Sequence, residues 1–171
     1  MKNGVIKSTA LALARVYGFC STLPFQFRKN RISPPENVSH SDWVDFLSTT
    51  FNKNGIRILE LGSRNVTGAN LRSRFSNADY IGLDFYAGEN VDVVGDAHKL
   101  SSYFKKEEKF DLIFSSVVFE HLHMPWIAAM EIQKMLNVGG FVFIETHFSF
   151  SSHERPWHFF QFSDMGLRSR Q

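Results

Sequence analysis

The sequence predicts an α/β protein in which a mostly parallel sheet carries helices on both faces. From residue 41 onward, short apolar stretches alternate with segments whose apolar residues recur at helical spacing. Strands and helices that alternate in this way form a parallel sheet covered on both sides. We therefore expect an α/β domain over residues 41–171, preceded by an N-terminal helix and linker over residues 1–40.

Helical spacing and terminal residues define the expected helices. Ser41 is expected to cap the first helix, which stops at Asn54–Gly55, and Pro125 suits the first turn of a later one that Gly139–Gly140 ends. Ser163 is expected to cap a last helix. The apolar residues that define these helices are Trp43, Phe46, Leu47 and Phe51, then Leu71 and Phe75, then Leu100, Tyr103 and Phe104, and finally Ala128, Ile132, Met135 and Leu136.

Five apolar stretches are the expected strands. They are residues 56–61 (IRILEL), 80–84 (YIGLD), 91–95 (VDVVG), 110–116 (FDLIFSS) and 141–150 (FVFIETHFSF). In open parallel sheets, ligands bind beyond the carboxyl ends of the strands, near the point where the strand order reverses. The chemistry should therefore follow the ends of the first four strands.

Composition limits the possible classes of function. The chain has 171 residues, 43% of them apolar and 21% charged, and a net charge of +2, which argues against a nucleic-acid partner. Its single cysteine, Cys20, excludes an intramolecular disulfide and fits a reducing compartment, so we expect a cytoplasmic protein. No segment reaches the roughly 18 apolar residues of a membrane span.

The N-terminal segment allows three interpretations. An amphipathic helix is favoured, since apolar residues fall on one helical face; a membrane-surface helix and a signal peptide are the alternatives. Arg15 interrupts the apolar run that a signal peptide needs, and Pro34 and Pro35 make residues 28–41 a linker. The residues of the apolar face are Ile6, Ala10, Leu13, Tyr17 and Cys20.

The turn after the first strand does not fit a dinucleotide cradle. The fingerprint G-x-G-x-x-G would place glycines at 62, 64 and 67, and the sequence has Gly62, Arg64 and Thr67. The second glycine lets the backbone approach a pyrophosphate, and an arginine side chain obstructs that approach. A nicotinamide-dependent reductase is therefore disfavoured.

Three strand ends each carry a carboxylate. Glu60 ends the first strand and would suit an ammonium group, and Asp84 lies near the offset at which a carboxylate accepts ribose hydroxyls. Asp96 follows the third strand. A ligand with an amine, a ribose and an exocyclic adenine amine matches this set, as S-adenosyl-L-methionine does. The structural alternatives are a turn glycine at Gly62, a loop start at Asp84 and a helix cap at Asp96.

With these motifs in order, the chain resembles class I S-adenosylmethionine-dependent methyltransferases of the small-molecule type, which have a Rossmann-like sheet. The resemblance rests on LELGSR, YIGLD, GDAHKL, FDLIFSSVVFEHL and MLNVGGFVFIET, between about Arg57 and Gly166. It implies that S-adenosyl-L-methionine is the cofactor. It also implies a cofactor-binding set made of Glu60, Gly62, Ser63, Asp84, Asp96, Ala97, Ser115 and Ser116.

His121 is the candidate catalytic residue. The segment FEHL follows the fourth strand, where the family places the transferred methyl group, and an imidazole there could accept a proton from an acceptor. A packed histidine bonded to backbone is the alternative. Glu120, His121 and His123 lack a further ligand at a diagnostic spacing, so we expect no metal. Weaker candidates on the same rim are His98, His153 and His158.

The segment after the fifth strand is expected to form the acceptor side or to be ordinary core. It resembles a subgroup of bacterial methyltransferases associated with cell-surface glycans, although Gln161 stands where an arginine is expected and His158 where an acid is expected. The aromatic residues in question are Phe148, Phe150, Trp157, Phe159, Phe160 and Phe162.

The sequence stops before the last two strands that the resemblance implies. The fifth strand would then be an apolar sheet edge, which favours pairing with a second copy of the chain. We expect a methyltransferase acting on a small molecule or a glycan. The alternative is a catalytically inactive remnant of the fold that binds cofactor or serves as an interaction module.

Overall fold

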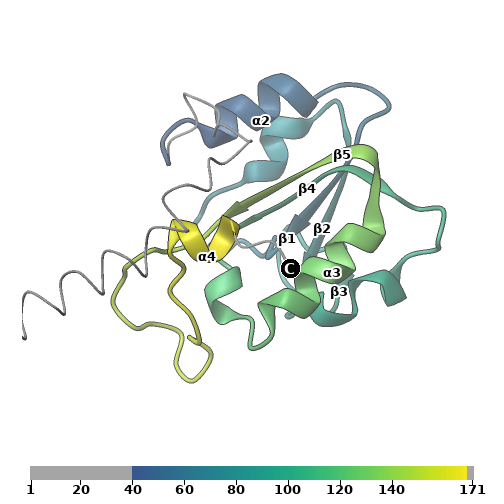
Figure 1. The fold of residues 1–171 in the computed structure, drawn as a ribbon. Coiled ribbons are helices and arrows are strands. Elements are labelled where there is room, and N and C mark those ends of the chain that lie inside the picture. The colour runs from purple at the N-terminus through teal and green to yellow at the C-terminus, as the bar shows by residue number, and fades with distance from the viewer. Residues whose placement is uncertain (1–39, 169–171) are drawn as a thin grey trace, which may run out of the picture. The chain divides into compact units, whose positions relative to one another are not determined.

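The computed structural model describes residues 40–168, so the expected N-terminal helix and linker lie outside the described residues apart from His40. Five parallel strands form one sheet in the order β3-β2-β1-β4-β5. Figure 1 shows them between two helical layers. The strands are β1 (Arg57–Leu61), β2 (Asp79–Asp84), β3 (Val93–Val94), β4 (Phe110–Ser116) and β5 (Leu136–Glu145). The strand order reverses at β1 and β4, which confirms the predicted fold class.

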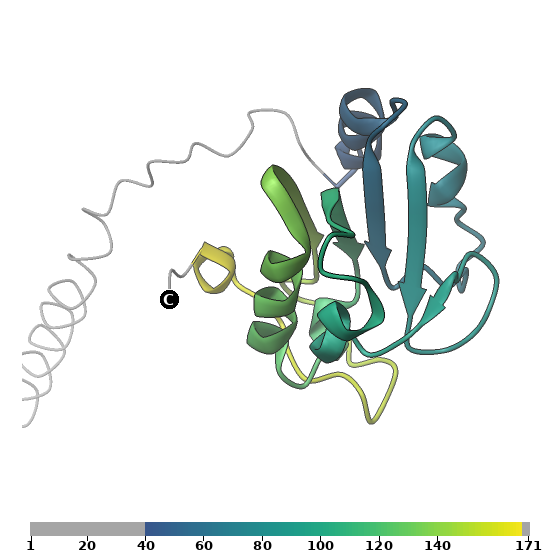
Figure 2. The same ribbon diagram turned by 90° about the vertical axis from the view of Figure 1, so that its right-hand side faces the viewer.

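The helices divide between the two faces of the sheet (Figure 2). They are α2 (Trp43–Phe51), α3 (Pro125–Met135) and α4 (Asp164–Arg168), with 3₁₀ helices η1 (Leu71–Phe75), η2 (Ala97–Tyr103) and η3 (Phe119–His121). On one face, Trp43 of α2 and Phe75 of η1 pack against Phe114 of β4. On the other face, Leu100 of η2 and Ile132 of α3 belong to the buried core.

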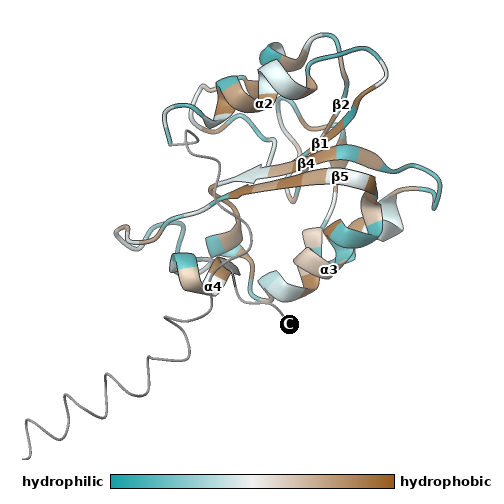
Figure 3. Cartoon of the chain, turned by 45° about the horizontal axis from the view of Figure 1, so that its top comes forward, coloured by the Kyte–Doolittle hydropathy of each residue, from teal (hydrophilic) through white to brown (hydrophobic). Residues whose placement is uncertain are grey.

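Alternation along β4 explains why both faces can be covered. Leu112 and Phe114 lie on the α2 face, whereas Ile113 lies on the α3 face, and all three are fully buried. A central parallel strand therefore reads as a continuous apolar run, because both of its faces are buried. Figure 3 shows this apolar colouring along β4 and β5.

Several element boundaries differ from the sequence-based expectation. The first helix has Asp42 rather than Ser41 at its N-cap, and β3 is two residues long. Gly139 and Gly140 do not end α3, which stops at Met135; they lie inside β5. The pairing shifts from Leu136 opposite Phe110 to Phe141 opposite Leu112, and Gly139 has a φ of +80°. The glycines therefore form a bulge, a position that favours residues without a Cβ.

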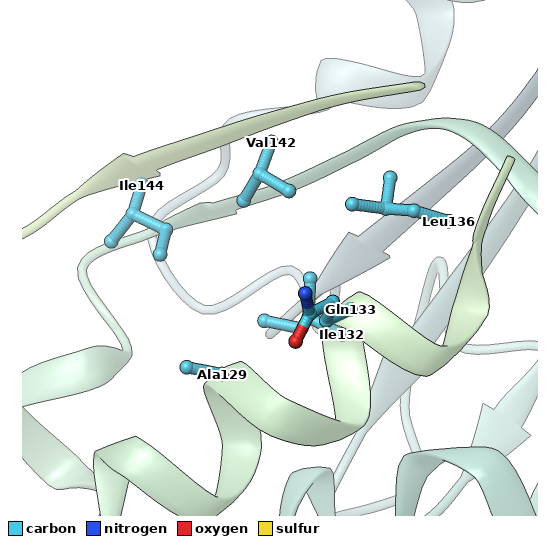
Figure 4. Close-up of a pocket in the computed structure, with 6 residues that line it drawn as sticks. All are labelled: Ala129, Ile132, Gln133, Leu136, Val142 and Ile144. Carbon is cyan, nitrogen blue, oxygen red and sulfur yellow. The ribbon is translucent and has the colours of Figure 1, made fainter. Parts of the chain in front are cut away.

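β5 is the edge of the sheet within the described residues, as expected, but it ends at Glu145 and not at residue 150. Its α3-facing side borders an apolar hollow, shown in Figure 4. The hollow is lined by Ala129, Ile132, Gln133, Leu136, Val142 and Ile144. Pairing of two chains through this strand stays a prediction. Among the described residues, none of the helices has the length and apolarity needed to cross a membrane.

Candidate functional site

Gly62 turns the chain at the carboxyl end of β1. The N–H groups of Gly62 and Ser63 both donate to the carbonyl oxygen of Leu83, at 2.8 and 3.2 Å, so the turn is fixed to β2. Gly62 has a φ of +84°, and a Cβ built there would lie 2.2 Å from Cγ2 of Val118. Both backbone conformation and space therefore require glycine at this position.

Two hydroxyl groups beside this turn are buried without a hydrogen-bond partner among the described residues. They are Ser63 Oγ, in the turn, and Ser115 Oγ, in β4 opposite Leu61. The two residues are 5% and 1% exposed. A buried hydroxyl without a partner costs about 1–3 kcal/mol. Such groups are suited to bind a polar ligand that supplies the missing hydrogen bonds.

Glu60 lies on the α2 face of β1, where it is 6% exposed and accepts a hydrogen bond from the hydroxyl of Tyr80. Burial raises the pKa of Glu60 to about 7, although the Tyr80 hydrogen bond and the charge of Arg72 lower it in part. Because Tyr80 does not stand out in the strand pattern, sequence reasoning did not identify this partner. The expected role of Glu60 toward an ammonium group stays a prediction.

The carboxylate of Asp84 is held at the end of β2 by backbone donors. Its Oδ2 accepts from the N–H of Arg64 at 3.2 Å and its Oδ1 from the N–H of Tyr86 at 2.9 Å. The Arg64 side chain crosses the same carboxylate, with Nε 3.6 Å from Oδ1 and its guanidinium 5.4 Å from the centre of the Tyr86 ring. The residue that replaces the second glycine therefore lies over the expected ribose-binding acid.

Asp96 forms the N-cap of η2. Its Oδ1 accepts from the backbone N–H of His98 at 2.9 Å and lies 2.6 Å from His98 Nδ1. Burial alone would raise the pKa of Asp96, but the two hydrogen bonds from His98 outweigh it and the pKa is lowered. His98 Nε2 in turn accepts from the N–H of Met124 at 3.3 Å, so His98 joins η2 to the start of α3. Ala97, beside Asp96, is buried.

Ser116 differs from its neighbour Ser115 in having a partner. Its hydroxyl donates to Glu145 Oε2 at 2.6 Å, and Glu145 Oε1 is bonded to His40. The next residue, Val117, has a φ of +57° and donates its N–H to the Glu145 carbonyl at 2.9 Å. A β-branched residue in the left-handed region is strained, and such strain is concentrated at functional sites.

His121 lies at the end of η3, next to the segment that follows β5. Its Nδ1 is 2.9 Å from the carbonyl oxygen of Trp157. Because a carbonyl oxygen only accepts, Nδ1 carries the proton and Nε2 has a free lone pair. Both sequence-based interpretations of His121 therefore hold in part, since it is bonded to backbone and keeps one nitrogen available as a proton acceptor.

The aromatic residues of this segment differ in exposure. Phe148 and Trp157 are 70% and 56% exposed, which excludes them from the core. Phe162 packs against the core. The segment is anchored because the N–H groups of Phe159 and Phe160 donate to the carbonyl oxygen of Glu120 at 2.8 and 3.1 Å. It therefore forms one side of the rim at the ends of β4 and β5.

Two residues of this rim were missed by the sequence analysis. His147 follows β5 and its Nδ1 lies 2.8 Å from Oε1 of Glu120. Glu145, the last residue of β5, bonds Ser116. The position of both after a strand end was the available signal. Asp111 is structural, as expected, since it accepts from the N–H of Arg57 at 2.9 Å and from Asn137 Nδ2 at 2.7 Å.

The family is shown by comparison with known sequences. Residues 27–168 match the family model described as "Methyltransferase domain", so the chain belongs to this family. Membership confirms the resemblance to class I S-adenosylmethionine-dependent methyltransferases and the cofactor class that it implied. None of the curated proteins matches the chain.

Solved structures show the same fold. The YcgJ protein of Bacillus subtilis is 19% identical, with a TM-score of 0.51, over 64% of this chain and 52% of that protein. The carbon methyltransferase CurJ is 18% identical with a TM-score of 0.47, over 58% of this chain and 31% of that one. The methyltransferase CalH, solved with S-adenosylhomocysteine, is 18% identical with a TM-score of 0.46, over 60% and 34%. The chain thus spans about half of the first structure and about a third of the other two.

Proposed function

We propose that this chain transfers a methyl group from S-adenosyl-L-methionine to a small-molecule or glycan acceptor at the carboxyl ends of β1, β2 and β4. The observation that carries the proposal is the pair of buried, unpaired hydroxyl groups of Ser63 and Ser115 on either side of the end of β1. Family membership supports the same reaction class.

The residues of the rim fit the cofactor in most respects. Ser63 and Ser115 would bind its amino-acid end, together with the turn at Gly62, and Asp84 would accept the ribose hydroxyls. Asp96 keeps a carboxylate beside the buried Ala97, as an adenine amine requires. Ser116 fits least well, because its hydroxyl is bonded to Glu145. Arg64 must leave part of its contact with Asp84 before a ribose can bind there.

The bound cofactor supplies an already activated methyl group. The chain therefore has to bind an acceptor in line with that group, exclude water and accept a proton where the acceptor carries one. Correct positioning is worth about 7–11 kcal/mol in favourable cases. His121 Nε2 has the free lone pair that proton acceptance needs, and a general base contributes roughly 10²- to 10⁴-fold.

The acceptor side is proposed from the segment after β5. The exposed rings of Phe148 and Trp157 offer flat apolar surfaces on which a sugar or another planar or amphipathic acceptor could pack. Saturation-transfer difference NMR with a panel of sugars and small phenols, in the presence of S-adenosylhomocysteine, tests this. Transfer to an acceptor that is lost in Trp157→Ala supports the proposed acceptor side; equal transfer in both proteins argues against it.

Cofactor binding is tested by calorimetric titration with S-adenosylhomocysteine. We expect binding by the full chain and a loss of at least about tenfold in affinity for Asp84→Ala, because two hydroxyl hydrogen bonds to a carboxylate are removed. Asp79→Ala is the matched control, since Asp79 begins the same strand and pairs with Arg57 at its opposite end. Equal affinities of both variants, or no binding by folded protein, would refute the proposal.

A further inference from the structure

Glu120 is a fully buried carboxylate whose surroundings are unusual. It is 0% exposed, and its Oε2 accepts from the hydroxyl of Thr146 at 2.8 Å. Its Oε1 lies 2.8 Å from His147 Nδ1 and 4.0 Å from His121 Nε2. Among the described residues, histidines are its only ion-pair partners. A buried carboxylate needs compensation by a positive charge, and imidazoles supply it only when protonated or when they hold a cation.

Two histidines turn the same nitrogen toward this carboxylate. His121 Nδ1 faces the Trp157 carbonyl at 2.9 Å, and His153 Nδ1 faces the Ser151 carbonyl at 3.0 Å. Each Nδ1 must donate to its carbonyl, so each Nε2 carries a lone pair. Metal-binding histidines show this arrangement, because the second nitrogen fixes the tautomer and the ring orientation.

The three side chains are close enough to share one ion. Glu120, His121 and His153 each offer one ligand atom, and these atoms lie within 4.8 Å of one another. Bonds of about 2.0–2.2 Å to a tetrahedral ion would place the atoms roughly 3.4 Å apart. The set therefore needs to close by about 1 Å, and only His121 and His153 have partly exposed side chains that can move.

Neighbouring histidines support the cluster without joining it. His158 Nδ1 accepts from the backbone N–H of His153 at 3.2 Å, and its Nε2 faces the Phe160 carbonyl at 3.2 Å, so both ring nitrogens are used. His147 contacts Glu120 through Nδ1 and stacks on Phe150 at 4.5 Å. These contacts hold Glu120 and His153 in place, as the outer partners of metal ligands do.

We propose that Glu120, His121 and His153 bind a divalent transition-metal ion of the zinc type. Two imidazoles and one carboxylate suit zinc and its first-row neighbours, and they do not suit magnesium, which prefers oxygen ligands alone. Three protein ligands leave a position open for another molecule. Sequence analysis predicted no metal because His153 lies far along the chain from Glu120 and His121, and no local spacing indicates it.

The role of the ion rests on the proposed function, although its binding does not. An open coordination position at the acceptor side would bind an oxygen or nitrogen atom of the acceptor and stabilise its deprotonated form. His121 would then act as a ligand, and the metal would replace it in lowering the proton affinity of the acceptor.

The test is titration of the purified full chain with Co²⁺, followed by its visible absorption, and with Zn²⁺, followed by calorimetry. We expect one equivalent of either metal to bind, with no saturable binding of Mg²⁺. His153→Ala should weaken binding by about 100-fold, because a ligand is removed. His123→Ala is the matched control: it removes an exposed imidazole two residues from His121 and should leave affinity unchanged. All titrations use the Cys20→Ser background, which removes the thiol as a competing ligand.

The outcomes separate this proposal from the proposed function. Absence of Co²⁺ and Zn²⁺ binding by folded protein, or equal losses in His153→Ala and His123→Ala, would overturn the metal site. S-adenosylhomocysteine binding is measured on the same samples. Metal binding without cofactor binding would refute the methyltransferase proposal and keep the metal site, and the reverse result would do the opposite.

Discussion

The hydroxyl of Tyr80 donates a hydrogen bond to the buried carboxylate of Glu60, one strand away on the same face of the sheet. Burial raises the pKa of Glu60 to about 7 in spite of this bond. The residue that was expected to offer a charge to the cofactor is therefore protonated in part near neutral pH. Ligand binding and folding stability should both depend on its titration.

Glu60→Gln should remove a pH dependence of stability. The pKa of Glu60 rises from 4.5 in the unfolded chain to about 7 in the folded protein, so the folded state binds more protons between these values. The free energy of unfolding of the native protein should therefore fall as pH rises from about 4.5 to 7, by roughly 3 kcal/mol at most. Glutamine keeps the acceptor oxygen for Tyr80 and does not titrate.

Urea unfolding at pH 5 and pH 8 measures this effect. Glu60→Gln should gain stability relative to the native chain between the two pH values. Glu107→Gln, which alters an exposed carboxylate, controls for the general effect of removing one charge. A stability difference between Glu60→Gln and the native chain that is the same at both pH values would contradict the assignment.

Gly62→Ala should destabilise the protein more than Gly68→Ala. Both glycines have a φ of +84°, but a Cβ at Gly68 meets no atom within 4 Å, whereas one at Gly62 meets Val118. The backbone term is about 1–2 kcal/mol at either site, and the collision adds about 1–3 kcal/mol at Gly62. Unfolding in urea measures both variants.

The double variant Gly62→Ala, Val118→Ala isolates the collision. Removing the Val118 methyl groups should bring the cost of Gly62→Ala close to that of Gly68→Ala. If Val118→Ala leaves the cost unchanged, the close approach of Val118 to the turn is not present in solution.

Arg64→Ala should strengthen binding of S-adenosylhomocysteine. The ion pair between Arg64 and Asp84 is partly exposed, and such pairs are worth up to about 1 kcal/mol, so the gain should not exceed about fivefold. Arg57→Ala removes an arginine from the other end of the sheet and is the control. Weaker binding by Arg64→Ala would show that Arg64 contacts the ligand and does not compete with it.

Most of the fold was predictable because the apolar pattern is strong. The buried strands β1, β2 and β4 have both faces covered, so they appear as continuous apolar runs whose ends fall close to their true limits. The boundary of β5 was wrong because Gly139 is compatible with a helix end and also with a bulge. Single-residue propensity does not separate these two positions.

The site was predictable only where a residue follows a strand directly. Asp84 and Ser115 were identified because strand ends meet at one edge of a parallel sheet. The cluster of Glu120 and His153 was not, because their proximity depends on the path of an irregular segment that no periodicity describes. Arg64 was identified as an obstacle to phosphate, but its contact with Asp84 follows from a side-chain conformation that the sequence does not specify.

The central claim is that a single cofactor binds at the carboxyl ends of β1, β2 and β4. The most direct test is a ¹⁵N–¹H NMR titration of the full chain with S-adenosylhomocysteine. The account predicts that the amide signals of Gly62, Ser63, Asp84, Ala97 and Ser115 shift together with one dissociation constant, while those of Asp79 and Asn137 at the opposite end of the sheet stay in place. Unchanged spectra of folded protein, or shifts confined to residues away from this edge, would contradict it.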